Sequence, residues 1–172
     1  MDRDGVINVD RGYVHKKEDF DFCEGIFDLV ESANRAGYRV IVVTNQAGIA
    51  RGYYSEDDFK RLTHWMLNEF KSRNCRIDQV YFCPFHPTAG HGRYLCDHDT
   101  RKPRPGMFLK ALSDFNLNAA ESLMIGDKES DMIAAAKAGV VKTFLLNRKG
   151  VEPTNTQAFA VIENLRSACG YL

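Results

Sequence analysis

Apolar residues in the first part of the chain follow two spacings, one typical of helices and one typical of strands. In residues 24–37 they recur every three or four positions, and Gly37 stands where a helix commonly ends. The next segment, YRVIVV at 38–43, is a short run rich in β-branched residues, as in the buried strands of parallel sheets. The two segments predict a helix followed by a strand.

The same order repeats further along. Ser55 with Asp58 is a variant of the capping box, and it predicts the start of a long helix that reaches about Arg73. The segment IDQVYF at 77–82 predicts the next strand. The residues expected on the buried face of the helix are Phe59, Leu62, Trp65, Met66 and Phe70.

The second half continues the alternation after a long irregular loop, 83–104. Pro105 is suited to the first turn of a helix that reaches Phe115. A strand at 122–125, a helix at 130–139 and a strand at 141–146 follow. Alternating helices and strands predict an α/β fold with a doubly wound parallel sheet in three layers, whose ligands bind beyond the carboxyl ends of the strands.

One domain over residues 1–172 fits this length, and we see no repeats and no sign of a large inserted cap domain. The tail from 151 to 172 carries only a weak helical pattern, around FAVIENLRSA. Access to a site would therefore be controlled by loops, chiefly 8–22 and 83–104.

Charge and composition narrow the function. The 23 basic residues equal the 23 acidic residues, which disfavours nucleic acid or a membrane surface as partner and favours a small-molecule substrate. No apolar run is long enough for a membrane span, and the five cysteines are scattered rather than arranged as a disulfide framework. We expect a cytoplasmic protein with reduced thiols, and a monomer.

Polar side chains follow the predicted strands where each one ends. Thr44 and Asn45 come after VIVV, Asp127 comes after SLMI, and Lys102 lies in the long loop. Taken singly, each could be an ordinary polar turn or a surface lysine. Because they stand at matched strand ends, we expect them to meet in one crevice.

The opening DRDG would add two carboxylates to that crevice if a strand preceded it. Asp2 and Asp4 are two residues apart, so on an extended segment both side chains point the same way, and Gly5 allows a sharp turn afterwards. A solvated turn is the alternative. A calcium loop is excluded, because Tyr13 stands where a bidentate glutamate is required.

These residues together resemble the four motifs of the haloacid dehalogenase (HAD) superfamily of phosphatases: Asp2-x-Asp4-Gly5, Thr44-Asn45, Lys102 and Gly126-Asp127-x-x-x-Asp131. The resemblance covers residues 1–146. Longer stretches, including VVTNQAGIARGYYSEDDF and RKPRPGM, are similar to the heptose-1,7-bisphosphate 7-phosphatase branch and somewhat less to the histidinol-phosphatases.

The resemblance implies a role for each motif. Asp2 is the implied nucleophile, which forms an aspartyl-phosphate, and Asp4 is the implied acid and base. Mg²⁺ is expected on the Asp2 carboxylate, the Asp4 backbone carbonyl and Asp127, with Lys102 neutralising charge. Thr44 is expected to bind a phosphate oxygen. Sugar or distal-phosphate contacts are expected from Asn45, Arg51 and Arg101, although each arginine could equally form a surface salt bridge.

The long loop departs from the zinc loop of that branch, Cys-x-His followed by Cys-x-Cys. Its first histidine is shifted by one position and its last cysteine is replaced. A structural Cys₂His₂ zinc site remains one interpretation, and a loop that packs without metal is the other. The four candidate ligands are Cys83, His86, Cys96 and His98.

A second departure concerns the first strand. In the HAD fold the nucleophile ends a central strand, but only Met1 precedes Asp2 here. Loss of a central strand leaves backbone groups unpaired and a gap in the core. We therefore expect this strand to be truncated in the sequence, with roughly 5–10 further residues, including an apolar run, in the natural product.

The implied activity is removal of the 7-phosphate of D-glycero-D-manno-heptose 1,7-bisphosphate, a step in nucleotide-activated heptose and lipopolysaccharide biosynthesis. Histidinol phosphate, another sugar phosphate or a polynucleotide 3′-phosphate are alternative substrates, and neutral charge disfavours the last. A catalytically inactive zinc-loop interaction module is the non-enzymatic alternative.

Overall fold

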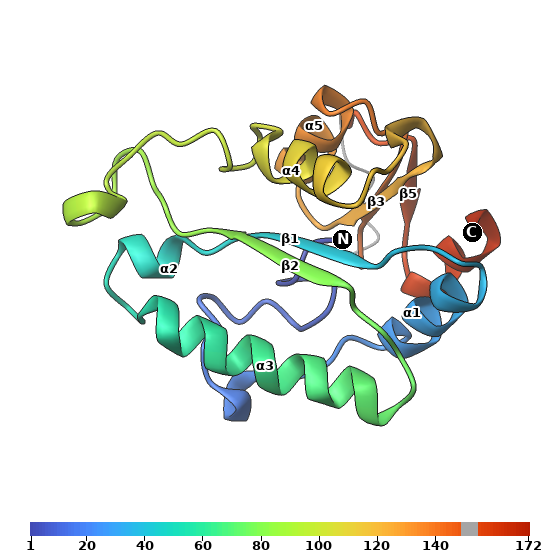
Figure 1. Ribbon diagram of the computed structural model, residues 1–172, viewed down its shortest axis with the longest axis horizontal. Helices are drawn as coiled ribbons and strands as arrows, with labels where there is room; N and C mark the ends of the chain where they lie inside the picture. Colours follow the sequence, from blue (N-terminus) through green and yellow to red (C-terminus); the bar gives the residue numbers. More distant parts are fainter. Residues whose placement is uncertain (149–154) are drawn as a thin grey trace.

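The computed structural model describes residues 1–148 and 155–172 as parallel strands with helices on both faces (Figure 1). The strands are β1 (Ile41–Asn45), β2 (Gln79–Cys83), β3 (Leu123–Gly126), β4 (Lys142–Leu146) and β5 (Ala160–Ile162). The α-helices are α1 (Ile26–Arg35), α2 (Ala47–Ala50), α3 (Glu56–Ser72), α4 (Gly106–Asp114) and α5 (Glu129–Lys137). Short 3₁₀ helices are η1 (Lys17–Asp19), η2 (Gly92–Tyr94), η3 (Ala119–Glu121) and η4 (Leu165–Tyr171).

The strands form two parallel sheets, β1-β2 and β3-β4-β5. The amino-terminal residues lie between them. The amino group of Met1 donates to the carbonyl of Ile41 (2.8 Å), Val43 N–H donates to the carbonyl of Met1 (2.9 Å), and Asp2 N–H donates to the carbonyl of Ile125 (3.0 Å). Residues 1 and 2 thus join β1 to β3, and the order across the molecule is β2, β1, residues 1–2, β3, β4, β5.

Alternate residues of the strands point into two different cores. Val42 and Ile125 pack with α1 and α3 on one face. Val43 and Met124 pack with α4 and α5 on the other. Figure 1 shows α3 and α4 on opposite sides of β1 and β2. This period of two is what a strand buried on both faces requires, and it confirms the expected α/β arrangement in three layers.

The long helix begins where the sequence indicated. The Ser55 hydroxyl accepts from Asp58 N–H (3.1 Å), and the Asp58 carboxylate accepts from Ser55 N–H (2.8 Å), so both halves of the capping box form. Of the five side chains expected on its inner face, four are buried and Trp65 packs at the edge of the core. At the end of α1, Gly37 takes the left-handed conformation with φ 84°.

Two predicted strands begin later than expected. β1 starts at Ile41 rather than at residue 38, and β2 starts at Gln79 rather than at 77. The cause is one side chain, because the Asp78 carboxylate accepts from Val40 N–H (2.8 Å) and replaces a ladder bond there.

The helical pattern predicted around FAVIENLRSA was wrong for its first part. Ala160–Ile162 form β5, which pairs with β4, and η4 follows at Leu165–Tyr171. Pairing with a neighbouring strand overrides a weak local preference here. Residues 151–154 of the predicted tail lie outside the described residues.

Candidate active site

A cavity of about 330 Å³ opens at the carboxyl ends of the strands, where β1 and residues 1–2 end. Loop 8–22 contributes Asp10, Gly12 and Tyr13 to its wall, and an ion pair of 3.0 Å between Asp10 and Lys128 spans it. The predicted site residues that line it are Asp2, Asp4, Asn45 and Lys102. Thr44 and Asp127 do not line the cavity, but Gln46 connects Thr44 to Asp4 and a ligand atom of Asp127 lies within 4.8 Å of one from Asp2.

A buried ion network lies at this cavity. Lys102 Nζ is 3.0 Å from Asp2 Oδ1 and 2.6 Å from Asp131 Oδ1, and all three residues are at most 5% exposed. Burial, together with the negative charge of Asp131, raises the pKa of Asp2 although Lys102 opposes the change. Burial alone would lower the pKa of Lys102, but the two carboxylates more than offset it, so its pKa is raised. The lysine is thus held as a cation beside the implied nucleophile.

Asn45 fixes the position of that lysine. Its amide nitrogen donates to the carbonyl of Lys102 (3.0 Å), and its amide oxygen accepts from Lys102 N–H (3.1 Å). The ammonium also donates to the carbonyl of Val43 (2.8 Å). These bonds orient Lys102, and the contact of Asn45 with the sugar or the distal phosphate stays a prediction.

Arg3 is a site residue that the sequence reasoning missed. Its Nη2 donates to both oxygens of Asp4 (2.8 and 2.9 Å) and to the carbonyl of Val14 (2.7 Å). The side chain is 1% exposed and its guanidinium lies over the ring of Phe59. Its pair with the neighbouring Asp4 is local, but its burial depends on Val14 and on Phe59 of α3, which no spacing rule reveals.

Gln46 was also missed, and it connects two predicted residues. Its amide nitrogen donates to Asp4 Oδ2 (3.0 Å) and to Thr44 Oγ1 (2.9 Å). The Tyr54 hydroxyl donates to its amide oxygen (2.6 Å). The Asp4 carboxylate fixes the orientation of the amide, because an ionised carboxylate can only accept and so requires the amide nitrogen, which leaves the amide oxygen to accept from Tyr54. The Thr44 hydroxyl therefore accepts from Gln46 and keeps its own proton to donate to a ligand.

Three carboxylates form a group suited to a metal ion. One ligand atom each from Asp2, Asp127 and Asp131 lies within 4.8 Å of the others, and no other such group of His, Cys, Asp or Glu occurs among the described residues. Asp127 Oδ1 is buried without a hydrogen-bond partner. Burial, with Asp2 and Asp131 adding negative charge, raises the pKa of Asp127 to about 7. Hard oxygen ligands and an unpartnered carboxylate fit Mg²⁺.

Asp131 belongs to the fourth motif but is not one of the Mg²⁺ ligands that the sequence predicts. In the structure it joins Asp2 and Asp127 in the group of three carboxylates. It stands in the first turn of α5, where its Oδ2 accepts from Lys128 N–H (3.1 Å). The Asp4 backbone carbonyl remains a predicted ligand.

Glycines give the carboxylates room to approach the backbone. Gly5 has φ 88°, and a Cβ there would lie 2.2 Å from Asp127 Oδ2. A Cβ on Gly126 would lie 2.4 Å from Asp131 Cβ. Both collisions involve the proposed metal ligands, which explains why the motifs need glycine at these places.

Arg51 and Arg101 are not among the residues that line the cavity. Arg51 lies 6.0 Å from the ring centroid of Tyr13, which does line it. Arg101 Nη1 donates to the carbonyl of Phe85 (3.1 Å), and its pKa is lowered by burial and by Arg51. The two guanidinium groups are thus close enough to repel each other. Their role in substrate binding stays a prediction.

The predicted zinc ligands have other environments. Cys83 is buried, Cys96 is exposed, and His86 Nδ1 accepts from the backbone of Thr88 and Ala89 (3.2 and 3.0 Å). His98 stacks on Phe85. Among the described residues these four side chains form no group within ligand distance. Zinc in this loop therefore stays a prediction, and the conformation shown packs the loop by aromatic and hydrogen-bond contacts.

Comparison with known proteins agrees with the geometry. A family model described as "HAD-hyrolase-like" matches residues 99–168. A curated relative from Burkholderia mallei, named D-glycero-alpha-D-manno-heptose-1,7-bisphosphate 7-phosphatase, is 52% identical over 172 residues, which is 100% of this chain and 91% of the relative. The chain belongs to the HAD phosphatases.

Two further relatives of this HAD phosphatase bear related names. A Vibrio cholerae protein named D-glycero-beta-D-manno-heptose-1,7-bisphosphate 7-phosphatase is 46% identical over 175 residues, covering 100% of this chain and 94% of the relative. A crystal structure of D,D-heptose 1.7-bisphosphate phosphatase from B. bronchiseptica, complexed with magnesium and phosphate, has a TM-score of 0.82 and 25% identity, covering 99% of this chain and 94% of that one. No helix in the described part of this HAD phosphatase is long and apolar enough to cross a membrane.

Proposed function

We propose that this HAD phosphatase removes the 7-phosphate of D-glycero-D-manno-heptose 1,7-bisphosphate by way of an aspartyl-phosphate. The observation that carries the proposal is the buried Asp2–Lys102–Asp131 network beside a cavity that Asp4 also lines. Relatives named for this reaction at 52% and 46% identity support the choice of substrate.

Asp2 and Asp4 account for both half-reactions, the formation of the aspartyl-phosphate and its hydrolysis. An oxygen of the Asp2 carboxylate bonds to phosphorus while the bond from phosphorus to the sugar oxygen breaks, and Asp4 gives its proton to that oxygen. The oxygen of a water molecule then bonds to the phosphorus of the aspartyl-phosphate while Asp4 takes a proton from that water, and the bond from phosphorus to the Asp2 oxygen breaks, which releases inorganic phosphate and restores the Asp2 carboxylate. Arg3, Asn8 and Gln46 hold the Asp4 carboxylate by N–H donors at 2.8–3.1 Å, which fixes its direction for both transfers.

Charge balance is the other requirement, since an anionic nucleophile must approach an anionic phosphate. Lys102 supplies one positive charge within 3.0 Å of Asp2. Mg²⁺ held by Asp2, Asp127 and Asp131 would supply charge that stabilises the transferring group. The free proton of Thr44 is available for one phosphate oxygen.

The second phosphate of the substrate needs cations away from the nucleophile. Arg51 and Arg101 come from the turn after α2 and from loop 83–104, and Arg51 lies over the ring of Tyr13, which lines the cavity. We assign these two arginines to the distal phosphate, because an anion between them would relieve their repulsion. The same contacts would make loops 8–22 and 83–104 the elements that control access.

A substrate panel tests the proposal. Phosphate release with Mg²⁺ is measured from both anomers of heptose 1,7-bisphosphate, histidinol phosphate and a 3′-phosphorylated oligonucleotide. We expect strong preference for one heptose anomer, and the measurement decides which, since the relatives are named for both. Preference for histidinol phosphate or the oligonucleotide would reject the substrate.

Asp2→Asn separates an enzyme from a binding module. The variant keeps the size of the side chain but loses the nucleophilic oxygen, so turnover should vanish while the fold stays. Release of phosphate by Asp2→Asn at the rate of the unaltered chain would reject the aspartyl-phosphate route. We further propose that the chain is a cytoplasmic monomer with a single domain. Its substrate is a small sugar phosphate.

A further inference from the structure

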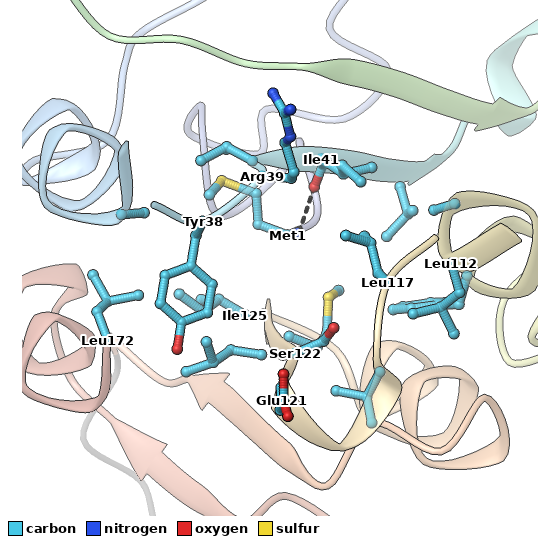
Figure 2. A pocket seen from close by; sticks show the side chains of 18 of the residues that line it. Met1, Tyr38, Arg39, Ile41, Leu112, Leu117, Glu121, Ser122, Ile125 and Leu172 are labelled. Atoms are coloured by element: carbon cyan, nitrogen blue, oxygen red, sulfur yellow. Dashed lines mark hydrogen bonds between the residues drawn. The ribbon is translucent and has the colours of Figure 1, made fainter. Parts of the chain in front are cut away.

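Loop 83–104 lies at the active-site end of the molecule. It contributes no residue to the apolar groove of about 520 Å³ between the starts of β1 and β3 (Figure 2). It leaves the carboxyl end of β2 and runs beside α2, where His91 N–H donates to the carbonyl of Ala50 (3.0 Å; Figure 1). Its last residues include Arg101 and the active-site Lys102. The contacts that fix the shape of this loop therefore affect the position of Arg101.

Two arms of the loop lie side by side. His86 N–H donates to the carbonyl of Tyr94 (3.0 Å), and Cys96 N–H donates to the carbonyl of His86 (3.2 Å). Close to these bonds the rings of Phe85 and His98 are stacked, with their centroids 4.3 Å apart and an angle of 16° between their planes. Backbone bonds and one ring contact thus join the two arms.

The two stacked residues also hold Arg101, one at each end. Arg101 N–H donates to the carbonyl of His98 (3.1 Å), and Arg101 Nη1 donates to the carbonyl of Phe85 (3.1 Å). The His98 ring is held in turn by Thr100, whose hydroxyl oxygen and backbone nitrogen lie 2.8 and 3.2 Å from its Nδ1. A shift of one ring against the other would move one of the two acceptors of Arg101.

The donor atoms of the candidate zinc ligands take part in this packing and do not converge. The Cys83 thiol is buried in hydrogen-bond contact with Thr100, and His86 Nδ1 accepts from two backbone N–H groups of the following turn. Among the described residues these side chains form no group within ligand distance. Phe85 stands at the histidine position of Cys-x-His, and His98 stands at the last cysteine position of Cys-x-Cys. The stack therefore joins the two positions at which the loop departs from the zinc pattern.

We propose that Phe85 and His98 are positioning residues, whose stacked rings take the place of a metal ion in loop 83–104 and fix Arg101 for the distal phosphate. Stacked ring pairs attract each other beyond the area that they bury, so the contact can join the two arms without zinc. The part that concerns the distal phosphate rests on the proposed function. The part that concerns the loop rests on its contacts alone.

Hydrogen exchange at the Arg101 amide tests the loop without substrate. His98→Asn removes one ring but keeps an acceptor for Thr100, and Phe85→Ala removes the other ring. We expect exchange at Arg101 to become about tenfold faster or more in both variants, because the loop opens more often. Phe85→Tyr keeps a ring and should keep the slow exchange. Leu95→Ala is the matched control, since Leu95 belongs to the same loop and is exposed.

Zinc is the second variable of this experiment. Exchange at Arg101 in the unaltered protein is measured with added ZnCl₂ and with a zinc chelator, and we expect the same slow rate in both. Slow exchange that requires zinc would overturn the proposal. The proposal is also overturned if His98→Asn and Phe85→Ala both exchange at the rate of the unaltered protein.

The Michaelis constant separates the positioning of Arg101 from a general structural effect. For heptose 1,7-bisphosphate we expect His98→Asn to raise KM about tenfold with little change in kcat. For heptose 7-phosphate, which lacks the distal phosphate, KM should not change, and Phe85→Tyr should behave as the unaltered chain with both substrates. Equal effects of His98→Asn on the two substrates would overturn the role in phosphate binding. Absence of turnover in the unaltered chain would instead reject the proposed function, and the exchange rates would still decide how the loop is held.

Discussion

The Gln46 amide links the two side chains that face the substrate phosphate in the proposed reaction. It is 1% exposed, and its nitrogen donates to Thr44 and Asp4 while its oxygen accepts from the Tyr54 hydroxyl. Burial raises the pKa of Tyr54, so the hydroxyl stays protonated and keeps donating at any pH at which the enzyme works. The Asp4 carboxylate sets the direction of the amide, and the Tyr54 hydroxyl supplies the hydrogen bond to its buried oxygen.

Tyr54→Phe tests this chain of bonds. Without the hydroxyl the Gln46 oxygen is left buried and unpaired, which costs about 1–3 kcal/mol, and the amide is held only through its nitrogen, by Thr44 and Asp4. We expect kcat to fall about tenfold with a smaller change in KM. Tyr53→Phe is the matched control, since Tyr53 is 56% exposed and should keep full activity. An unchanged kcat in Tyr54→Phe would show that the bonds to Thr44 and Asp4 are enough to hold the amide.

The pKa of Asp127, raised to about 7 from 3.8, predicts how magnesium binding depends on pH. A metal ligand must lose its proton, so below pH 7 each unit should weaken the apparent Mg²⁺ affinity about tenfold, with a plateau above. Titration calorimetry at pH 6, 7 and 8 measures this. Asp127→Asn is the control and should bind weakly at all three values. A flat profile in the unaltered protein would contradict the prediction.

The same shift has a consequence for stability without metal. A carboxyl whose pKa is raised in the folded state contributes stability that is complete below its unfolded pKa of 3.8 and is lost as the pH rises through about 7. Magnesium should remove this loss, because it binds the ionised form.

The elements of the fold were predictable where local signals are strong. The Ser55–Asp58 cap and the apolar spacing of α1 and α3 need no distant partner. β5 was not predictable, because three residues, Ala160–Ile162, become a strand only through pairing with β4. The motif residues at strand ends were placed correctly since parallel strands bring their carboxyl ends together, whereas Arg3, Gln46 and Tyr54 depend on long-range contacts that spacing does not reveal.

The turn at Gly5 depends on the absence of a side chain at this residue. Gly5→Ala would place a Cβ 2.2 Å from Asp127 Oδ2 and must displace that carboxylate or the turn. We expect phosphatase activity to fall at least about a hundredfold, since misplacement by about 1 Å is enough for such a loss. Activity and Mg²⁺ affinity are the measurements.

Gly37→Ala is the matched control for Gly5→Ala. Gly37 has a similar φ, 84°, but nothing lies within 4 Å of a Cβ there. Both variants therefore carry the backbone cost of a left-handed alanine, about 1–2 kcal/mol, and only Gly5→Ala carries the collision. Equal activity in the two variants would show that the contact with Asp127 is not critical.

At the scale of the whole molecule, the Asp2–Lys102–Asp131 network ties together segments that are far apart in the chain. Asp2 belongs to the amino-terminal segment between the sheets, Lys102 to the end of loop 83–104, and Asp131 to α5. The lysine also bonds to β1 through Val43. One ammonium group therefore holds both sheets and the active-site loop at a common point.

Lys102→Met should test whether this network stabilises the fold as well as the reaction. Removal of the cation leaves two buried carboxylates beside each other, so the free energy of unfolding should fall by about 3–5 kcal/mol in urea titrations.

Adding Asp131→Asn to Lys102→Met should recover part of that loss without restoring activity, because one of the unpaired charges is gone. Lys110→Met, which removes an exposed pair with Asp114, should change stability by no more than about 0.5 kcal/mol. If Lys102→Met were as stable as Lys110→Met, the two carboxylates would have to be protonated in the metal-free protein, and Lys102 would serve the reaction alone.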